Sequence, residues 1–257
     1  MIYLKTEEEI QLIRHSSLLV SKTLAEVARY IKPGITTIKL DQIAEEFIHD
    51  HGAKPGFKGY RGFPATLCVS VNENVVHGIP DKYELREGDI VSIDCGVLKN
   101  GYYGDSAYTF AVGNVKPEIL ALMKATKEAL YKGIEQAVAG KRIGDIGNAI
   151  QQHVKPMGYG VVRELIGHGV GKNLHESPDV PNYGKKGYGV LLSEGMVIAI
   201  EPMINFGKRH IVQEDDGWTI RTLDRKPSAH YEHTIAVRKN KADILSSFEE
   251  IEKIINN

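Results

Sequence analysis

The chain has 257 residues, of which 42% are hydrophobic and 25% charged, so it can bury a large core as one big domain or as two fused halves. A formal net charge of −1 gives no indication of a nucleic-acid or membrane partner. The two cysteines, Cys68 and Cys95, lack the spacing of a metal or redox motif, which fits a reducing compartment.

The amino-terminal sequence MIYLKTEEEI carries acids where a signal peptide needs an apolar core, and no apolar run in the chain reaches the length of a membrane span. We therefore expect a soluble cytoplasmic protein. A capping box at 6–9 opens the first predicted helix, whose apolar residues follow at helical spacing to Ile31 and which stops at 32–34. A second helix has apolar positions from Leu40 to Ile48 and closes at Gly52.

Residues 91–110 are predicted to form a β-hairpin, because Asn100-Gly101 is a strong signal for a two-residue type I′ turn. This turn would pair Gly96 with Asp105 and Asp94 with Ala107, so the two aspartates become diagonal neighbours on one face, roughly 7–8 Å apart at Cα. Two like charges between apolar strands are unfavourable unless a positive charge lies between them. The alternative is that this face is solvated and the acids are ordinary surface residues. The opposite face is predicted to be core: Val91, Ile93, Cys95, Tyr108 and Phe110.

Two further helices, predicted over 117–140 and 146–158, repeat the pattern of the first pair. Their landmarks lie 106 residues after those of the first pair. The strand regions echo each other as well, because HGIPD at 77–81 matches HESPD at 175–179. Each half of the chain is therefore predicted to contain two helices followed by antiparallel strands, with the halves at approximately 6–112 and 115–240.

Acidic residues occupy comparable positions in the two halves. REGDIVSID matches SEGMVIAIE, which sets Asp94 against Glu201, and the segment that begins at Asp105 resembles the one that begins at Glu232. A lone acid at a strand end is usually just solvated. If the halves pack around a pseudo-twofold axis, however, the four acids converge. A pair of divalent cations commonly compensates the repulsion between carboxylates that cluster in this way.

His168 is a candidate for a further ligand. It lies between two glycines, where no neighbouring side chain blocks the imidazole, although a lone histidine in a glycine-rich loop is more often structural. This loop is not a Walker motif, because Ile166 and Asn173 stand where glycine and serine or threonine are needed, and Lys172 breaks a dinucleotide fingerprint. HESPD lacks the second histidine of a zincin. No Gly-x-Ser-x-Gly elbow is present, and neither cysteine has a nearby histidine partner in the sequence, so nucleophilic catalysis is unsupported.

The segments SIDCG, GDSA, GHGVG, IEP and YEHT carry the five potential ligands in order. Together with His77 and His175 they make the whole chain resemble the type I methionine aminopeptidases of the short bacterial form. The resemblance implies the α+β pita-bread fold of the creatinase and prolidase group, with two pseudo-symmetric halves of helices packed on a curved antiparallel sheet, as a single catalytic domain over 1–257. It also implies removal of the N-terminal methionine from nascent proteins and peptides when the second residue is small and uncharged.

The resemblance implies a site for two divalent metal ions, held by Asp94, Asp105, His168, Glu201 and Glu232. Asp94 would be bidentate on one metal, Asp105 and Glu232 would bridge the two metals, and His168 and Glu201 would complete the other site. Such a ligand set suits Co²⁺, Mn²⁺, Fe²⁺ or Zn²⁺ and does not choose among them. The nucleophile implied is a metal-bridging hydroxide, because the cations lower the pKa of bound water.

Catalytic roles follow from the same resemblance. Glu201 would shuttle the proton, His175 would hydrogen-bond the scissile carbonyl, and His77 would contact the departing peptide nitrogen. The alternative for either histidine is a structural residue. The implied wall around the methionine side chain stays apolar although two of its members depart from the commoner family residues, Phe57 and Leu174. The wall consists of Phe57, Tyr60, Phe63, Cys68, Leu174 and Trp218.

Other interpretations share these residues. A prolidase-type Xaa-Pro peptidase would use the same ligands but usually carries a large N-terminal domain, whereas the first helix here begins at about residue 6. A type II methionine aminopeptidase would carry a helical insert that the 31 residues from Glu201 to Glu232 cannot contain. A binding module without catalysis would typically lose a ligand. We expect a monomer with N-terminal methionine as its substrate, the ribosome as a candidate partner, and no specific nucleic-acid or membrane partner.

Overall fold

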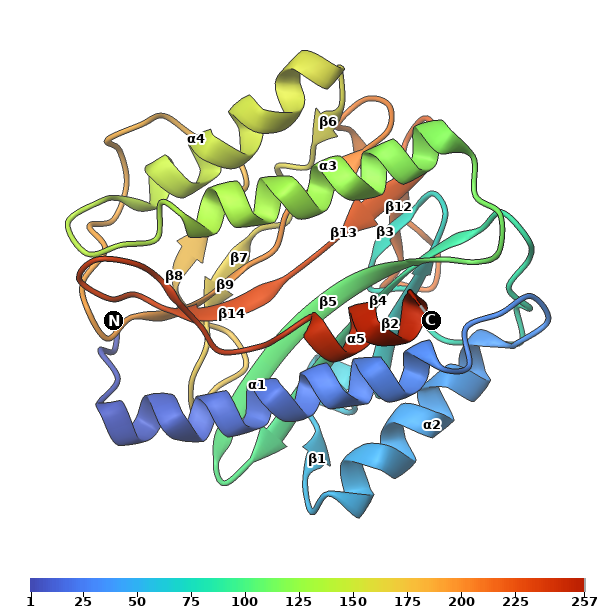
Figure 1. Cartoon of the computed structure of the whole chain (residues 1–257), viewed down its shortest axis with the longest axis horizontal. Coiled ribbons are helices and arrows are strands. Elements are labelled where there is room, and N and C mark those ends of the chain that lie inside the picture. Colours follow the sequence, from blue (N-terminus) through green and yellow to red (C-terminus); the bar gives the residue numbers. More distant parts are fainter. Residues whose placement is uncertain (257) are drawn as a thin grey trace.

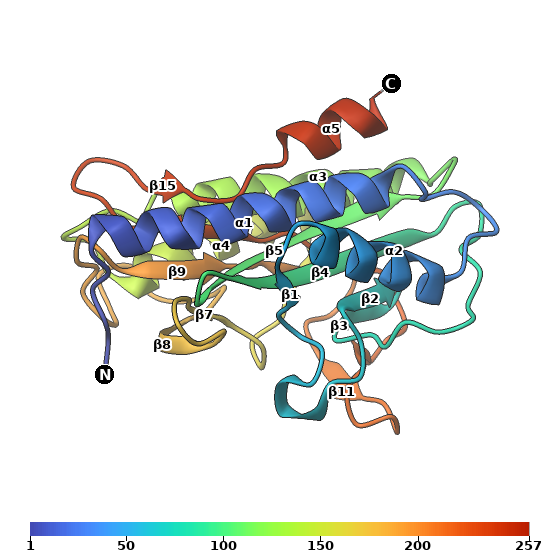
Figure 2. The same cartoon turned by 90° about the horizontal axis from the view of Figure 1, so that it is seen from below.

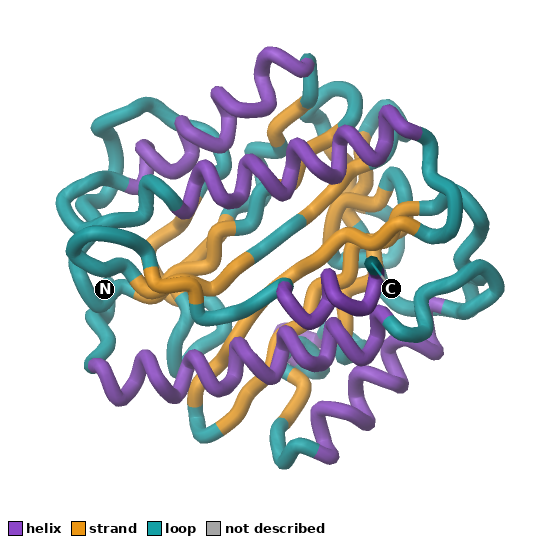
Figure 3. The backbone as a smooth tube through the Cα atoms, in the orientation of Figure 1, coloured by secondary structure: helices purple, strands orange, loops and turns teal. Residues whose placement is uncertain are grey.

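The computed structural model describes residues 1–256. The helices are α1 (Glu7–Ala28), α2 (Thr37–Asp50), α3 (Pro117–Ile134), α4 (Ile143–Val154) and α5 (Glu249–Ile255), with short 3₁₀ turns at Tyr60–Gly62 and Lys155–Met157. In the view of Figures 1 and 3, α1 and α2 run along the lower edge of the molecule, and α3 and α4 run along the upper edge. Figure 2 shows that α1, α3 and α4 all cover the same face of the strands. No helix within residues 1–256 is long and apolar enough to span a lipid bilayer.

The strands pair antiparallel in four sheets. Their bounds are β1 (Lys54–Pro55), β2 (Leu67–Val71), β3 (Asn74–Val76), β4 (Ile90–Lys99), β5 (Tyr102–Ala111), β6 (Gly160–Val161), β7 (Gly167–Gly169), β8 (Glu176–Val180), β9 (Val197–Ile200), β10 (Met203–Asn205), β11 (Ile211–Gln213), β12 (Ile220–Thr222), β13 (Ser228–His230), β14 (His233–Ala236) and β15 (Asp243–Ile244). One sheet has the order β1-β4-β2 with β5 paired to β4, and another has the order β15-β14-β9-β7-β8. The smaller sheets have the orders β13-β10-β6 and β11-β12-β3.

The hairpin predicted from Asn100-Gly101 is confirmed. β4 and β5 pair in the expected register, with Gly96 opposite Asp105 and Asp94 opposite Ala107. The two turn residues have φ values of 52° and 80°, as a type I′ turn requires. The face predicted to be core is buried under the helices, at Val91, Ile93, Cys95, Tyr108 and Phe110.

The helices are confirmed, with differences at their ends. Thr6 and Glu9 form the predicted capping box at the start of α1. α1 and α3 end earlier than predicted, so Ile31 packs against the core without being helical, and Val138 lies past α3. Val138 forms an isolated bridge with Arg238, a contact that local periodicity does not contain. α5 has seven residues with only one buried position and was not predicted.

A close backbone contact fixes the hairpin under α1. A Cβ atom at Gly104 would lie 2.3 Å from the backbone nitrogen of Ser17, so only glycine fits there. The Ser16 hydroxyl donates a hydrogen bond to the carbonyl of Tyr102 at 2.9 Å. Because Asp105 follows Gly104 directly, the helix determines the depth at which this aspartate enters the centre of the molecule.

Candidate metal centre and adjoining pocket

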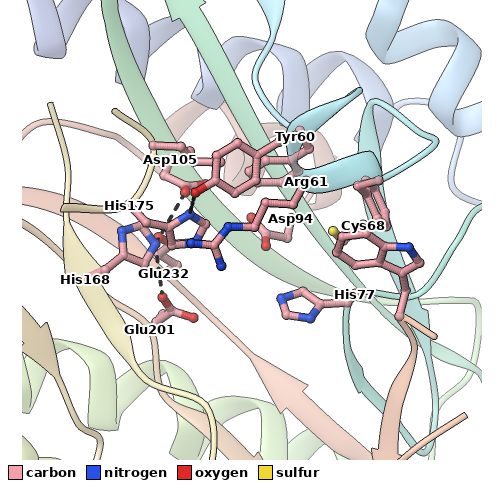
Figure 4. Close-up of a pocket in the computed structure, with 14 residues that line it drawn as sticks. Tyr60, Arg61, Cys68, His77, Asp94, Asp105, His168, His175, Glu201 and Glu232 are labelled. Atoms are coloured by element: carbon pink, nitrogen blue, oxygen red, sulfur yellow. Dashed lines mark hydrogen bonds and ion pairs between the residues drawn. The ribbon is translucent and has the colours of Figure 1, made fainter. Parts of the chain in front are cut away.

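One cavity of about 150 Å³ brings together every residue for which the sequence predicted a role in the site. It lies where β4, β5, β7 and the ends of β9 and β14 meet, and Figure 4 shows the side chains that converge on it. One further residue, Arg61, was not predicted. The lining consists of Phe57, Tyr60, Arg61, Phe63, Cys68, His77, Asp94, Asp105, His168, Leu174, His175, Glu201, Trp218 and Glu232.

The acids come from both halves of the chain, and hydrogen bonds join the segments that carry them. The Ser106 hydroxyl donates to the carbonyl of Glu232 at 2.6 Å, and the backbone nitrogen of Glu232 donates to the carbonyl of Ala107 at 2.9 Å. The Thr234 hydroxyl donates to the carbonyl of Asp105 at 2.7 Å. These contacts place the carboxyl of Glu232 beside the hairpin that carries the two aspartates.

Ligand-type atoms in the cavity are close enough to share a cation. Asp105, His168 and Glu232 each offer one such atom within 4.8 Å of the others. The Nε2 atom of His168 lies 3.8 Å from Oδ2 of Asp105 and 3.6 Å from Oε1 of Glu201 (Figure 4). One carboxylate oxygen of each of Asp94, Asp105 and Glu232 is buried without a hydrogen-bond partner among residues 1–256. Buried oxygens of this kind need a partner, and a cation would supply it.

The raised pKa values of the four acids support the same conclusion. Burial raises the pKa of Asp94 and of Glu201 to about 7. Burial, together with the neighbouring carboxylates, raises the pKa of Asp105 and of Glu232 well above the usual range. Four such groups can be ionised together only when positive charge lies between them. The site thus fits divalent cations with mainly oxygen ligands and one imidazole.

Two histidines border the metal centre. His175 lies directly before β8, and its Nδ1 atom is 2.9 Å from the hydroxyl of Tyr60, whose ring stacks on the imidazole with centroids 5.2 Å apart. Partial burial and the neighbouring His168 lower the pKa of His175 to about 3. Burial and the nearby His230 lower the pKa of His77 to about 4. Both rings are therefore neutral at physiological pH and keep one N–H donor each.

The loop before His175 is held by a buried ion pair. Nζ of Lys5 lies 2.5 Å from Oε2 of Glu176, and both side chains are only 6% exposed. Oε1 of Glu176 also accepts a hydrogen bond of 3.1 Å from the backbone nitrogen of Asn173. The segment ahead of α1 thus fixes the residue that follows His175.

Apolar side chains form the other wall of the cavity. Phe57, Phe63, Cys68 and Leu174 are buried in one cluster, with Tyr60 and Trp218 packed against it. The rings of Phe63 and Trp218 meet edge to face at 5.1 Å. A Cβ atom at Gly96 would lie 2.5 Å from the ring of Phe57, so the hairpin leaves room for this phenylalanine only because glycine is present. Burial raises the pKa of the Cys68 thiol well above its usual value, which leaves the wall uncharged.

The sequence did not predict two residues at the site. The guanidinium of Arg61 lies 5.4 Å from the centroid of the Tyr60 ring. His230 is 1% exposed, and its Nε2 atom is 3.6 Å from Oε2 of Glu201, so imidazoles flank both oxygens of this carboxyl. The two-residue spacing of His230 and Glu232 at a strand end was an available signal for the histidine. For Arg61 the only signal was its place between two glycines next to Tyr60.

Comparison with known proteins agrees with this geometry. The model of metallopeptidase family M24 matches residues 11–239. The chain is 52% identical over 246 residues to a methionine aminopeptidase of Clostridium perfringens, covering 96% of this chain and 99% of that protein, and 50% identical over 246 residues to methionine aminopeptidase 1 of Bacillus subtilis, with the same coverage.

Solved structures show the same fold. The crystal structure of methionine aminopeptidase from Rickettsia prowazekii is similar with a TM-score of 0.95 at 40% identity, covering 96% of this chain and 100% of that one. A prolidase from Pyrococcus furiosus matches with a TM-score of 0.78 at 25% identity, covering 95% of this chain and 65% of that one. The predicted α+β pita-bread fold and the resemblance to methionine aminopeptidases are therefore confirmed. The chain is a metal-dependent hydrolase that belongs to metallopeptidase family M24 and groups there with the methionine aminopeptidases.

Proposed function

We propose that the protein removes the N-terminal methionine from nascent polypeptides in the cytoplasm when the second residue is small and uncharged. The observation that carries the proposal is a single cavity in which a carboxylate and histidine cluster adjoins an apolar wall. The cluster fits the chemistry of peptide hydrolysis, and the wall fits an unbranched thioether side chain. The chain would act as a single catalytic domain with its ligands drawn from two similar halves.

The unpartnered carboxylate oxygens fit two divalent cations, with Asp94, Asp105, His168, Glu201 and Glu232 as the ligands. When bound, such ions polarise a scissile carbonyl and lower the pKa of water to near neutrality. Mn²⁺, Fe²⁺, Co²⁺ and Zn²⁺ all suit this ligand set.

The chain's own residues orient the substrate and move the proton. In our proposal a carboxylate oxygen of Glu201 accepts the proton of the attacking water, and Glu201 then passes this proton to the departing nitrogen. The hydroxyl of Tyr60 lies 2.9 Å from Nδ1 of His175. We assign the hydroxyl as the donor in this contact, which places the imidazole hydrogen on Nε2. His175 can then donate from Nε2 to the carbonyl oxygen as negative charge develops there. His77 contacts the departing nitrogen.

The same two histidines limit the second residue of the substrate. Both line the cavity beside the carboxylates, so the side chain that follows methionine must pass between them and the metal centre. Bulk there would push the scissile carbonyl out of position, and a displacement of ~1 Å can reduce the rate by ~10²-fold. Alanine, glycine and serine fit this limit, whereas lysine and phenylalanine do not.

Peptide hydrolysis with added Mn²⁺ or Co²⁺ tests the proposal. Met-Ala-Ser should be cleaved, while N-acetyl-Met-Ala-Ser should be inert, because metal binding requires the lone pair of a free amine whose pKa is about 7.7–8.0. Met-Phe and Met-Lys peptides should be poor substrates. The prolidase relative makes Ala-Pro the relevant competitor. Cleavage of Ala-Pro in preference to Met-Ala-Ser, or equal cleavage of the acetylated peptide, would refute the proposed specificity.

A further inference from the structure

Arg61 is the one lysine or arginine that lines the cavity among residues 1–256. Its side chain reaches over the ring of Tyr60, and Figure 4 shows it beside His175. No carboxylate of residues 1–256 forms an ion pair with it, whereas Arg225 and Arg209, which line other clefts, pair with Glu73 and Glu164. Lys58, three residues earlier, pairs with Glu45 at 2.6 Å and lies outside the cavity. A guanidinium without an acidic partner is therefore present at the cavity that receives substrate.

The backbone holds Arg61 in place. Its φ is 49°, and it lies in a turn between Gly59 and Gly62, which have φ values of 84° and 90°. The backbone nitrogen of Gly59 donates to the carbonyl of Phe63 at 2.8 Å, and that of Phe63 donates to the carbonyl of Tyr60 at 3.0 Å, so the turn is closed from both ends. A residue other than glycine persists at such a φ only where its surroundings fix it. From this turn the Arg61 side chain extends over the Tyr60 ring.

Arg61 stands next to the path that the substrate must take. Tyr60 contacts His175 directly, and both Tyr60 and His175 line the cavity together with Arg61, whose guanidinium lies beside the imidazole (Figure 4). In the proposed function the second residue of the substrate lies beside His175. The third residue then leaves the cavity next to Arg61.

We propose that Arg61 binds a carboxylate carried by the third residue of the substrate, and so favours peptides that are acidic at that position. The inference rests on the proposed function. A guanidinium matches a carboxylate with two parallel N–H donors, which makes arginine well suited to this recognition. The carboxylate can come from an aspartate or glutamate side chain or from the C-terminus of a tripeptide.

The test compares kcat/KM for amidated peptides, which lack the terminal carboxylate. The wild type should cleave Met-Ala-Glu-NH₂ about two- to fivefold faster than Met-Ala-Gln-NH₂, the size of effect typical of an exposed ion pair. Arg61→Gln should bring this ratio to about one. Arg61→Glu should reverse the charge preference, so that Met-Ala-Lys-NH₂ is cleaved faster than Met-Ala-Glu-NH₂. Higher ionic strength should reduce the wild-type preference. Lys58→Ala is the matched control and should keep the wild-type ratio.

The outcomes separate the two proposals. If neither amidated peptide is cleaved, the proposed function fails and the assignment of Arg61 fails with it. If it is cleaved but the ratio is the same in the wild type and in both Arg61 variants, the assignment alone is overturned. A preference for free-acid Met-Ala-Gln over its amide that disappears in Arg61→Gln assigns the contact to the terminal carboxylate. Because each variant is compared with itself on two peptides, a general loss of activity does not change the result.

Discussion

The hydroxyl of Tyr60 lies 2.9 Å from Nδ1 of His175, and the two rings stack with their centroids 5.2 Å apart. The tyrosine belongs to the first half of the chain and the histidine to the second, 115 positions later. One residue thus serves both walls of the cavity: its ring contributes to the apolar surface, and its hydroxyl orients the imidazole beside the metal centre.

Tyr60→Phe should reduce kcat while leaving the metal content unchanged. The variant keeps the ring but removes the hydrogen bond that fixes the tautomer and angle of the His175 imidazole. Such a bond typically contributes about 0.5–1.5 kcal/mol, which corresponds to a loss of about two- to tenfold. Steady-state kinetics on Met-Ala-Ser measure the effect, with Tyr30→Phe on the surface as the control. An unchanged kcat would show that the hydroxyl does not orient the histidine.

His175→Ala should separate catalysis from metal binding. The histidine is outside the proposed ligand set, so elemental analysis should find the same metal content as in the wild type. Loss of one donor to a developing oxyanion typically lowers kcat by about 10²–10³-fold. Loss of the metals, or a wild-type kcat, would contradict the role that we assign to this residue. His15→Ala, on the exposed face of α1, is the control.

Asp105→Asn should lower metal content and peptidase rate together. Asp105 is buried, and one of its oxygens lies 3.8 Å from Nε2 of His168. As a ligand shared by two ions it would supply negative charge to both, and an amide supplies none. A calorimetric titration with the metal ion measures the loss of metal binding, with the exposed Asp50→Asn variant for comparison. Full activity of a chelator-treated wild-type sample would remove the basis of this prediction.

Lys5→Met should destabilise the protein and lower its activity. The substitution leaves Glu176 as a buried charge without its partner, which typically costs about 3–5 kcal/mol. Activity should fall as well, because Glu176 adjoins His175. Lys253→Met breaks an exposed pair with Glu249 and should leave the free energy of unfolding nearly unchanged. In urea unfolding, adding Glu176→Gln to Lys5→Met should recover part of the loss, and additive losses would argue against a coupled pair.

Asp41→Asn should make stability less dependent on pH. Oδ1 of Asp41 accepts hydrogen bonds from the backbone nitrogens of Thr66 and Leu67 at 2.9 and 2.8 Å, yet burial raises its pKa above the ordinary 3.8. The folded state therefore binds a proton more readily than the unfolded state, and stability falls as the pH rises from 3.8 through the folded pKa. Asparagine keeps an acceptor oxygen and carries no charge. The variant should be more stable than the wild type in urea at pH 7, with the difference vanishing near pH 3.

The parts of the fold that depend on neighbouring residues could be predicted from the sequence. Asn100-Gly101 determines both the turn and the pairing of Asp94 and Asp105, because the geometry of a two-residue loop fixes the register. The capping box at the start of α1 is equally local. The pattern of four acids at similar places in two halves predicted that they meet, and the cavity brings them together.

What the sequence did not predict depends on contacts between distant segments. α3 ends at Ile134, and Val138, which lies past its end, forms a bridge with Arg238, one hundred residues later. His230 reaches Glu201 because β10 pairs with β13 and β9 pairs with β14, which places the two residues side by side. Arg61 enters the cavity through a turn whose direction depends on positive φ values that its own side chain does not favour. In each case tertiary packing overrides or supplements the local pattern.

The hydrogen bond between Ser106 and Glu232 spans 126 residues, and this separation has a consequence for the order of folding. Contacts between distant segments form late, because the entropy of closing the intervening loop must be lost before the contact is gained. A chain synthesised from its amino terminus completes α1, α2 and the β4–β5 hairpin long before Glu232 is available. Until the second half of the chain is synthesised, the aspartates of that hairpin must therefore be either protonated or hydrated. Any chain cut short before residue 232 lacks the complete ligand set, so metal uptake would report the finished fold.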